Sequence, residues 1–132
     1  MRIRTLLPAV LATLALGGCT ATNPNASAGD FTGAEKDVAQ VIDDLKVSRD
    51  PGEVCSRMFS DELAKSLAAG GRDCVDEVDA MLRDVAASDL DVKDVTISGT
   101  TARAEVSQDG KTATFELARG KGGWQLTSLG ES

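Results

Sequence analysis

The residues of this chain best suited to covalent chemistry are its three cysteines, Cys19, Cys55 and Cys74. A thiol can become a thioether, a disulfide, a metal ligand or a nucleophile, and its surroundings decide which of these it becomes. Activation of a serine in a hydrolase triad needs a histidine, and the sequence has none. A triad of that kind is therefore excluded.

Cys19 follows an export signal. Arg2 and Arg4 precede an apolar stretch over residues 6–16, which is shorter than the roughly 20 residues that a membrane-spanning helix needs. The run Leu16-Gly17-Gly18-Cys19 resembles the lipobox of bacterial lipoproteins. The resemblance implies a signal peptide over residues 1–18, a lipid on the thiol of Cys19, and an exported protein anchored to the outer face of the cell membrane. The alternative is a plain signal peptide with an incidental cysteine.

Cys55 and Cys74 remain as a pair once Cys19 carries a lipid. In an oxidising compartment an even number of cysteines favours a disulfide. The alternatives are two buried thiols or a redox pair, but neither cysteine belongs to a Cys-x-x-Cys motif. We therefore expect a structural bridge between Cys55 and Cys74.

The segment after Cys19 is small, polar and interrupted by one proline, so residues 19–29 are predicted to form the lipidated cysteine and a flexible tether. Residues 30–132 are then one domain. Removing the two arginines of residues 1–18 from 14 basic residues leaves 12 against 21 acidic ones, a net charge of −9. This charge argues against nucleic-acid binding through a basic patch and against attraction to anionic lipid.

The carboxylates are the other candidates for chemistry. Asp37, Asp44, Asp76 and Asp79 fall mostly on polar faces of predicted helices, where we expect solvated groups. The aspartates do not follow the spacing of a calcium-binding loop, and no histidine–cysteine metal pattern is present. The sequence thus predicts no metal, no cofactor and no catalytic residue. An enzyme is the least favoured function, because it would need a buried carboxylate with a raised pKa.

Three helices are predicted in the first half of the domain. The first begins at Thr32, where Glu35 completes a capping-box pattern, and buries an apolar stripe. The second begins at Asp50 and continues past Ser60 to a stop at residues 70–71. The third begins at Asp73. Cys55 and Cys74 fall near the starts of the second and third helices, which a disulfide would join.

The second half predicts a four-stranded antiparallel sheet. Asp109-Gly110 is a strong two-residue hairpin turn, and turns at residues 99–100 and 120–121 complete the meander. All three registers place the apolar residues on one face, and a slip by one residue would break this agreement. The expected neighbours are Ile97 with Ala102, Val95 with Ala104, Val106 with Ala113, Ala104 with Phe115, Ala102 with Leu117, Leu117 with Trp124, and Phe115 with Leu126. The expected class is α+β, with three N-terminal helices packed on a curled sheet.

This element order, with a glycine-rich turn leading into Trp124, resembles the nuclear-transport-factor-2-like (cystatin-like, cone-shaped α+β) superfamily. The residues at 55–63 (CSRMFSDEL) are similar to those of small secreted lipoproteins of high-GC Gram-positive bacteria. In those proteins a cysteine in this stretch pairs with a second cysteine opening the next helix. The superfamily includes enzymes, ligand carriers and protein-binding modules, so the fold alone does not give the function.

Two functions for an anchored, non-catalytic domain follow. Small residues on the apolar face could leave room for a small apolar ligand, or could simply let a helix pack closely. Alternatively, the polar face of the sheet, rich in threonine and carrying Arg103, Glu105 and Glu116, could bind an envelope protein. The candidate apolar pocket consists of Ala102, Ala104, Ala113, Phe115 and Trp124.

Overall fold

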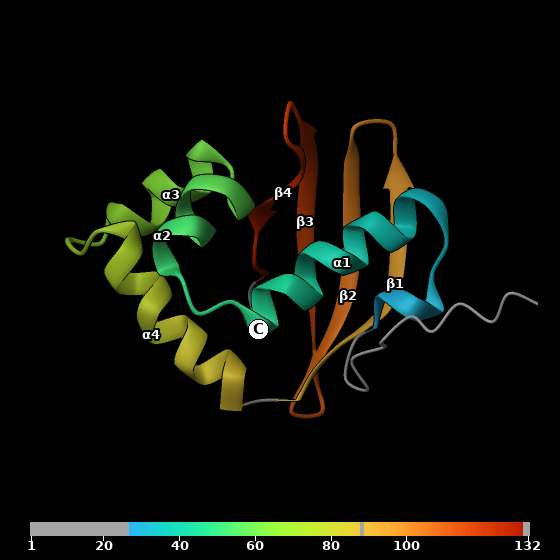
Figure 1. Cartoon of the computed structure of the whole chain (residues 1–132), viewed down its shortest axis with the longest axis horizontal. Coiled ribbons are helices and arrows are strands. Elements are labelled where there is room, and N and C mark those ends of the chain that lie inside the picture. The colour runs from blue at the N-terminus through green and yellow to red at the C-terminus, as the bar shows by residue number, and fades with distance from the viewer. Residues whose placement is uncertain (1–26, 88, 131–132) are drawn as a thin grey trace, which may run out of the picture.

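The protein is an α+β domain in which helices pack on a four-stranded antiparallel sheet. The computed structural model describes residues 27–87 and 89–130, so the predicted signal peptide, Cys19 and the tether as far as residue 26 lie outside the described residues. The strands follow one another in the order β1-β2-β3-β4, and the sheet is open. Figure 1 shows α1 crossing one face of the sheet, with α2, α3 and α4 toward its β4 edge. Within the described ranges, no helix has the length and apolar character to cross a membrane.

The helical half contains more elements than the three predicted helices. Beside the short 3₁₀ turn η1, it has four α-helices and one π-helical turn, η2. Their bounds are η1 Ala28–Asp30, α1 Gly33–Val47, α2 Pro51–Glu53, η2 Val54–Met58, α3 Asp61–Ala68 and α4 Cys74–Ala87.

The expected helix starts are found, although one cap differs in detail. Asp50 accepts a hydrogen bond from the backbone N–H of Glu53 at 3.1 Å, and Pro51 occupies the first turn of α2. Thr32 is the N-cap of α1, but its side chain makes no capping hydrogen bond. The capping box predicted there is therefore wrong. The first-turn N–H of Lys36 instead donates to the backbone oxygen of Thr32 at 3.4 Å.

The second predicted helix is broken in the middle. After the π turn η2, Phe59 is extended and nearly fully buried, with 1% of its surface exposed. The N–H of Ser60 donates to the backbone oxygen of Leu126 at 2.9 Å, and Phe59 forms a parallel bridge with Leu126. Burial of the Phe59 ring and this contact with β4 override the helical pattern. The Ser60 hydroxyl then accepts from the N–H of Leu63 and begins α3 as a separate helix.

The strands span β1 Leu90–Ser98, β2 Thr101–Gln108, β3 Lys111–Gly120 and β4 Gly123–Ser128. The predicted pairing of β2 with β3 is confirmed, as are the two predicted pairs between β1 and β2. A register shift between Val92 and Asp94 interrupts β1.

The predicted pairing of β3 with β4 is wrong by two residues. Leu117 pairs with Leu126, and Arg119 pairs with Trp124. Three glycines surround Lys121, so the sequence does not single out one turn, and the structure places Gly123 at a positive φ of 107°. Because the side-chain period of a strand is two, the shift leaves Trp124 and Leu126 on their expected buried face. A further irregularity opposite Glu116 and Leu117 pairs Ser128 with Glu116.

The core lies between α1 and the sheet. Val38, Ile42 and Leu45 of α1 are at most 1% exposed, which confirms the predicted apolar stripe. The sheet contributes the residues Val95, Ala102, Ala104, Val106, Phe115, Leu117, Trp124 and Leu126.

The disulfide between Cys55 and Cys74 is present, with the two Cα atoms 6.2 Å apart. It joins η2 to the first residue of α4. The pairing predicted from cysteine number is therefore confirmed, although Cys55 lies in a π turn rather than in an α-helix.

Two residues of the predicted tether, Ser27 and Ala28, are buried, with 1% and 2% of their surface exposed. Hydrogen bonds to α1 and β1 hold them there, as described below.

Candidate functional site

The five residues of the predicted apolar pocket do not line one cavity. Ala102 and Ala104 are buried in the core on β2, an interior strand that α1 crosses. Ala113 and Phe115 line a surface groove of about 250 Å³ that also involves α4. Trp124 lines a different groove, at the β4 edge.

The groove at Trp124 has a volume of about 330 Å³ and lies between the C-terminal half of α1, the α2–η2 segment and β4. We call it the Trp124 groove. Residues of α1 line one wall of this groove, and residues of the α2–η2 segment line another. Its lining residues are Val41, Asp44, Val47, Ser48, Glu53, Arg57, Met58 and Trp124.

Trp124 is the most unusual member of this groove. It is 7% exposed, and the guanidinium carbon of Arg119 lies over its ring, 5.7 Å from the centroid. Its indole Nε1–H is buried and has no hydrogen-bond partner, and no other buried side-chain nitrogen or oxygen of the described residues is in that state. A buried donor without an acceptor costs about 1–3 kcal/mol. A ligand atom that accepted this hydrogen bond would recover that cost.

The rim of the Trp124 groove is both apolar and charged. Val47 is 51% exposed, one of two large apolar side chains on the described surface with such exposure. Glu53 forms an exposed ion pair with Arg57 at 3.5 Å, while Asp44 accepts a hydrogen bond from the neutral amide of Gln40 at 2.8 Å. With the guanidinium of Arg119 over the Trp124 ring, two carboxylates and two guanidinium groups balance around the groove.

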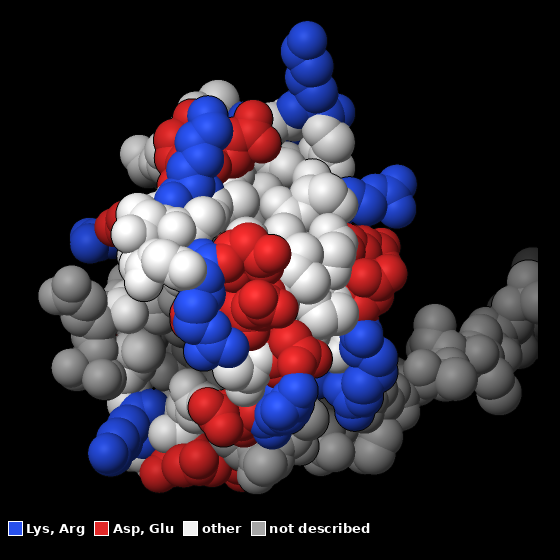
Figure 2. Space-filling view, turned by 90° about the vertical axis from the view of Figure 1, so that its left-hand side faces the viewer, with Lys and Arg blue, Asp and Glu red and all other residues white. Residues whose placement is uncertain are grey.

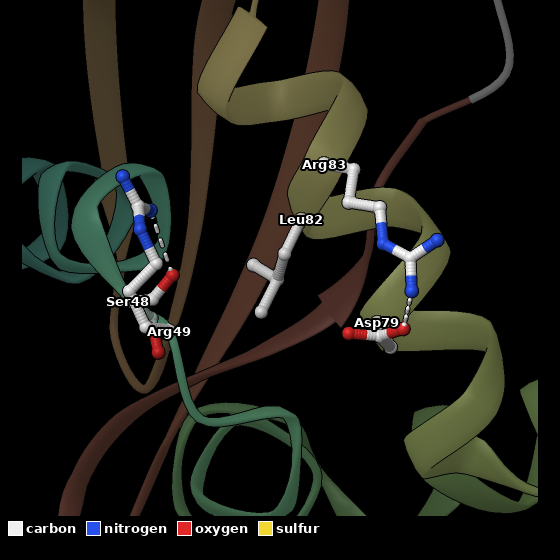
Figure 3. A pocket seen from close by; sticks show the side chains of 5 residues that line it. All are labelled: Ser48, Arg49, Asp79, Leu82 and Arg83. Atoms are coloured by element: carbon white, nitrogen blue, oxygen red, sulfur yellow. Dashed lines mark hydrogen bonds and ion pairs between the residues drawn. The ribbon is translucent and has the colours of Figure 1, made fainter.

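Another pocket, of about 180 Å³, lies between the segment after α1 and α4. Figure 3 shows Leu82 between Arg49 on one side and the ion pair of Arg83 with Asp79 on the other. Arg49 donates to the backbone oxygen of Ser48 at 3.1 Å. The charged groups here are thus engaged with neighbours from their own segments, and the pocket is smaller than the Trp124 groove.

The helical side of the molecule carries mixed charge. Figure 2 shows acidic side chains gathered near the middle of this face, with basic side chains around them. Helix α4 alone carries four acidic residues and one basic residue, Arg83. The predicted surface carboxylates Asp37, Asp44 and Asp76 are exposed, and Asp79 is half-buried. In the described part of the chain, no three acidic, histidine or cysteine side chains are grouped to hold a metal ion.

Asp43 is the functional candidate that the sequence reasoning missed. It is 5% exposed, and both of its carboxylate oxygens accept hydrogen bonds from the backbone, from the N–H groups of Ser27 and Ala28. Its only signal in the sequence is its position directly after Ile42, beside the apolar stripe of α1. Backbone donors carry no sequence signature, so this partner could not be predicted.

The opposite face of the sheet is polar, and Arg103 of β2 forms a cross-strand ion pair with Glu116 of β3 at 3.4 Å. Both side chains are largely exposed, and such surface pairs contribute little stability. This face carries the residues of the predicted interaction surface.

Comparison of the chain with protein-family models, with curated proteins and with solved structures finds no match.

Proposed function

We propose that this chain is a lipoprotein anchored through Cys19 to the outer face of the cell membrane, with a non-catalytic domain of the nuclear-transport-factor-2-like type that binds a small ligand in the Trp124 groove. The observation that carries the ligand-binding proposal is the unpartnered indole N–H of Trp124 in a residue that lines an open groove. This groove replaces the alanine-lined pocket expected from the sequence.

The lining defines the chemistry of the ligand. Val41, Val47 and Met58 favour an apolar body, and the indole N–H favours one hydrogen-bond acceptor such as a carbonyl oxygen. The charges of Asp44 and Glu53 are balanced by those of Arg57 and Arg119, which favours a neutral ligand. The Nε1 atom is itself buried, so an acceptor reaches it only after the side chains that cover it move.

Native mass spectrometry of the mature protein purified from its own host tests ligand binding. We expect a bound mass that is lost in Val47→Asp, because a charge placed on this half-exposed side chain enters the apolar wall of the groove. Val75→Asp is the matched control, since Val75 is 43% exposed on α4 and does not line the groove. A ligand-free wild-type protein, or equal loss in both variants, would contradict the proposal.

Anchoring is tested separately by flotation with membranes and by the mass of the mature N-terminus. Wild-type protein should float and carry acyl chains on Cys19, and Cys19→Ser should do neither. One acyl chain binds a membrane only weakly, whereas two give a stable anchor. A wild-type protein that is released without lipid would refute the anchoring.

A second candidate function is protein binding through the polar face of the sheet. It is favoured by one observation: the described helices pack on the other face, so the side chains around the Arg103–Glu116 pair are open to a partner. Co-purification from membranes with wild-type protein, but not with Arg103→Glu, would support this function. Partners that are retained equally by the variant would argue against it.

A further inference from the structure

The N-terminal segment of the described chain is held by a buried carboxylate. The two oxygens of Asp43 accept hydrogen bonds from the backbone N–H of Ser27 at 3.1 Å and of Ala28 at 2.7 Å. All three residues are at least 95% buried. A carboxylate that accepts two backbone N–H groups makes charge-assisted bonds, which are stronger than neutral ones.

Ser27 is also tied to the sheet. Its hydroxyl donates to a carboxylate oxygen of Asp91 at 2.6 Å and accepts from the backbone N–H of Val92 at 2.9 Å. Both residues belong to β1, an edge strand. We call these contacts of Ser27 and Ala28 with Asp43, Asp91 and Val92 the N-terminal clasp.

The clasp defines where the chain leaves the domain. Eight peptide steps separate Cys19 from Ser27, and a fully extended chain spans at most about 28 Å over that length. The lipid on Cys19 therefore has to insert within this distance of the β1 edge. Without the clasp, residues 27–32 would add up to about 20 Å to the tether, and the domain could turn about it.

We infer that the N-terminal clasp biases the orientation of the anchored domain, so that its β1 edge lies toward the bilayer more often than the β4 edge that carries the Trp124 groove. The inference rests on the lipid anchor proposed above. β1 and β4 are the two opposite edges of the sheet, and Ser27 is bound to β1 whereas Trp124 lies on β4 (Figure 1). The groove is thereby presented to ligands arriving from outside the cell.

Charge alone does not provide this orientation. Near the clasp, Asp30 and Asp91 stand beside Lys93, which pairs with Asp91. The described residues near this edge include two lysines, Lys46 and Lys93, among acidic side chains, rather than the larger basic cluster that draws a protein surface toward anionic lipids. The orientation therefore depends on the hydrogen bonds of the clasp.

The test uses the full mature lipoprotein in vesicles of phosphatidylcholine and phosphatidylglycerol that contain a dansyl-labelled lipid. Trp124 is the only tryptophan of the chain, so energy transfer from it to the dansyl headgroups reports how near the groove comes to the bilayer. Asp43→Asn opens the clasp, because its amide nitrogen faces backbone donors. Ser27→Ala removes only the bonds to β1, and Asp37→Asn is the control on the exposed face of α1.

We expect low energy transfer in the wild type and in Asp37→Asn. In Asp43→Asn it should rise, because transfer falls with the sixth power of distance and close approaches dominate the average. Ser27→Ala should lie between them. Hydrogen exchange at the amides of residues 27, 28 and 92, measured on the same samples, reports whether the clasp is open while the rest of the domain stays folded.

Equal transfer in the wild type and in a folded Asp43→Asn variant whose amides exchange rapidly would overturn the inference. High transfer in the wild type with an intact clasp would overturn it as well. Both outcomes are distinct from failure of the anchor, because an unlipidated protein does not float with the vesicles.

Discussion

Removal of the Cys55–Cys74 bridge should destabilise the domain by an amount that the structure allows to be calculated. The bridge closes a loop between residues 19 positions apart. In the chain-entropy treatment, a loop of that length in the unfolded chain contributes about 3 kcal/mol to the free energy of unfolding at 25 °C. This is a large part of the roughly 5–15 kcal/mol by which most domains are stable.

Urea unfolding of Cys55→Ala/Cys74→Ala, followed by the fluorescence of Trp124, measures this loss. With a urea m-value of about 1–2 kcal/mol/M, the midpoint should fall by about 2 M. The m-value itself should rise, because the unfolded chain without the bridge exposes more surface. Reduction of the wild type with dithiothreitol is the control, since it cuts the same link and keeps both sulfur atoms in place.

A loss below about 1 kcal/mol in both samples would refute the reasoning. It would mean that the unfolded chain is already compact between the two cysteines, so that the bridge removes little entropy. A large loss in the double variant alone would instead indicate that packing of the sulfur atoms between η2 and α4 carries the stabilisation.

Three further predictions concern the core, a turn and the dependence on pH. Phe59→Ala should lower the free energy of unfolding by about 3–5 kcal/mol in denaturant melts, because it removes a buried ring and leaves a cavity in the core. An unchanged melt would place the ring outside the core. Gly110→Ala should cost about 1–2 kcal/mol in thermal melts, because Gly110 has a φ of +81°, and a neutral result would show that the hairpin turn had changed type. Hydrogen bonds from Lys93 and then Ser27 lower the pKa of Asp91, so stability should be greatest above pH 3.8 and fall as the pH drops through the lowered value. Asp91→Asn should flatten this acid limb of a pH series, and a variant with the wild-type limb would contradict the assignment.

The sheet was predictable because one turn is unambiguous. Asp109-Gly110 fixes the register between β2 and β3, and the structure places Asp109 at a positive φ of 51° as that turn requires. The last hairpin was predicted two residues out of register because Lys121 lies among three glycines. The buried residues of β4, Trp124 and Leu126, were still predicted correctly, because a shift of two residues keeps each side chain on the same face.

The helical half was less predictable because long-range contacts override local pattern there. The local mark of the break is Ser60, which the sequence indicates only as the cap of a continuing helix. The bridge from Phe59 to Leu126 connects residues that are far apart in the sequence. The disulfide followed from cysteine number and compartment rather than from helical spacing.

The candidate site could be predicted only in part. The sequence predicts Trp124 as a site residue, whereas Ala102 and Ala104 of β2 are buried in the core. Trp124 lines one groove and Ala113 with Phe115 another, and both grooves are formed by contacts between elements that no local pattern encodes. Asp43 was overlooked because it binds backbone groups of a segment assigned to the tether.

The contacts at the two edge strands of the sheet affect how copies of the protein would pack beside one another. Ser27 occupies a backbone donor of β1 at Val92, and Ser60 occupies a backbone acceptor of β4 at Leu126. Unpaired strand edges are templates on which identical chains add to one another. Molecules anchored in one plane meet far more often than molecules free in solution, so growth of a continuous sheet across neighbouring copies would be a particular hazard there. At these two positions the edge is engaged by its own chain, which opposes pairing with a strand of another copy where the proposed anchor holds copies on one surface.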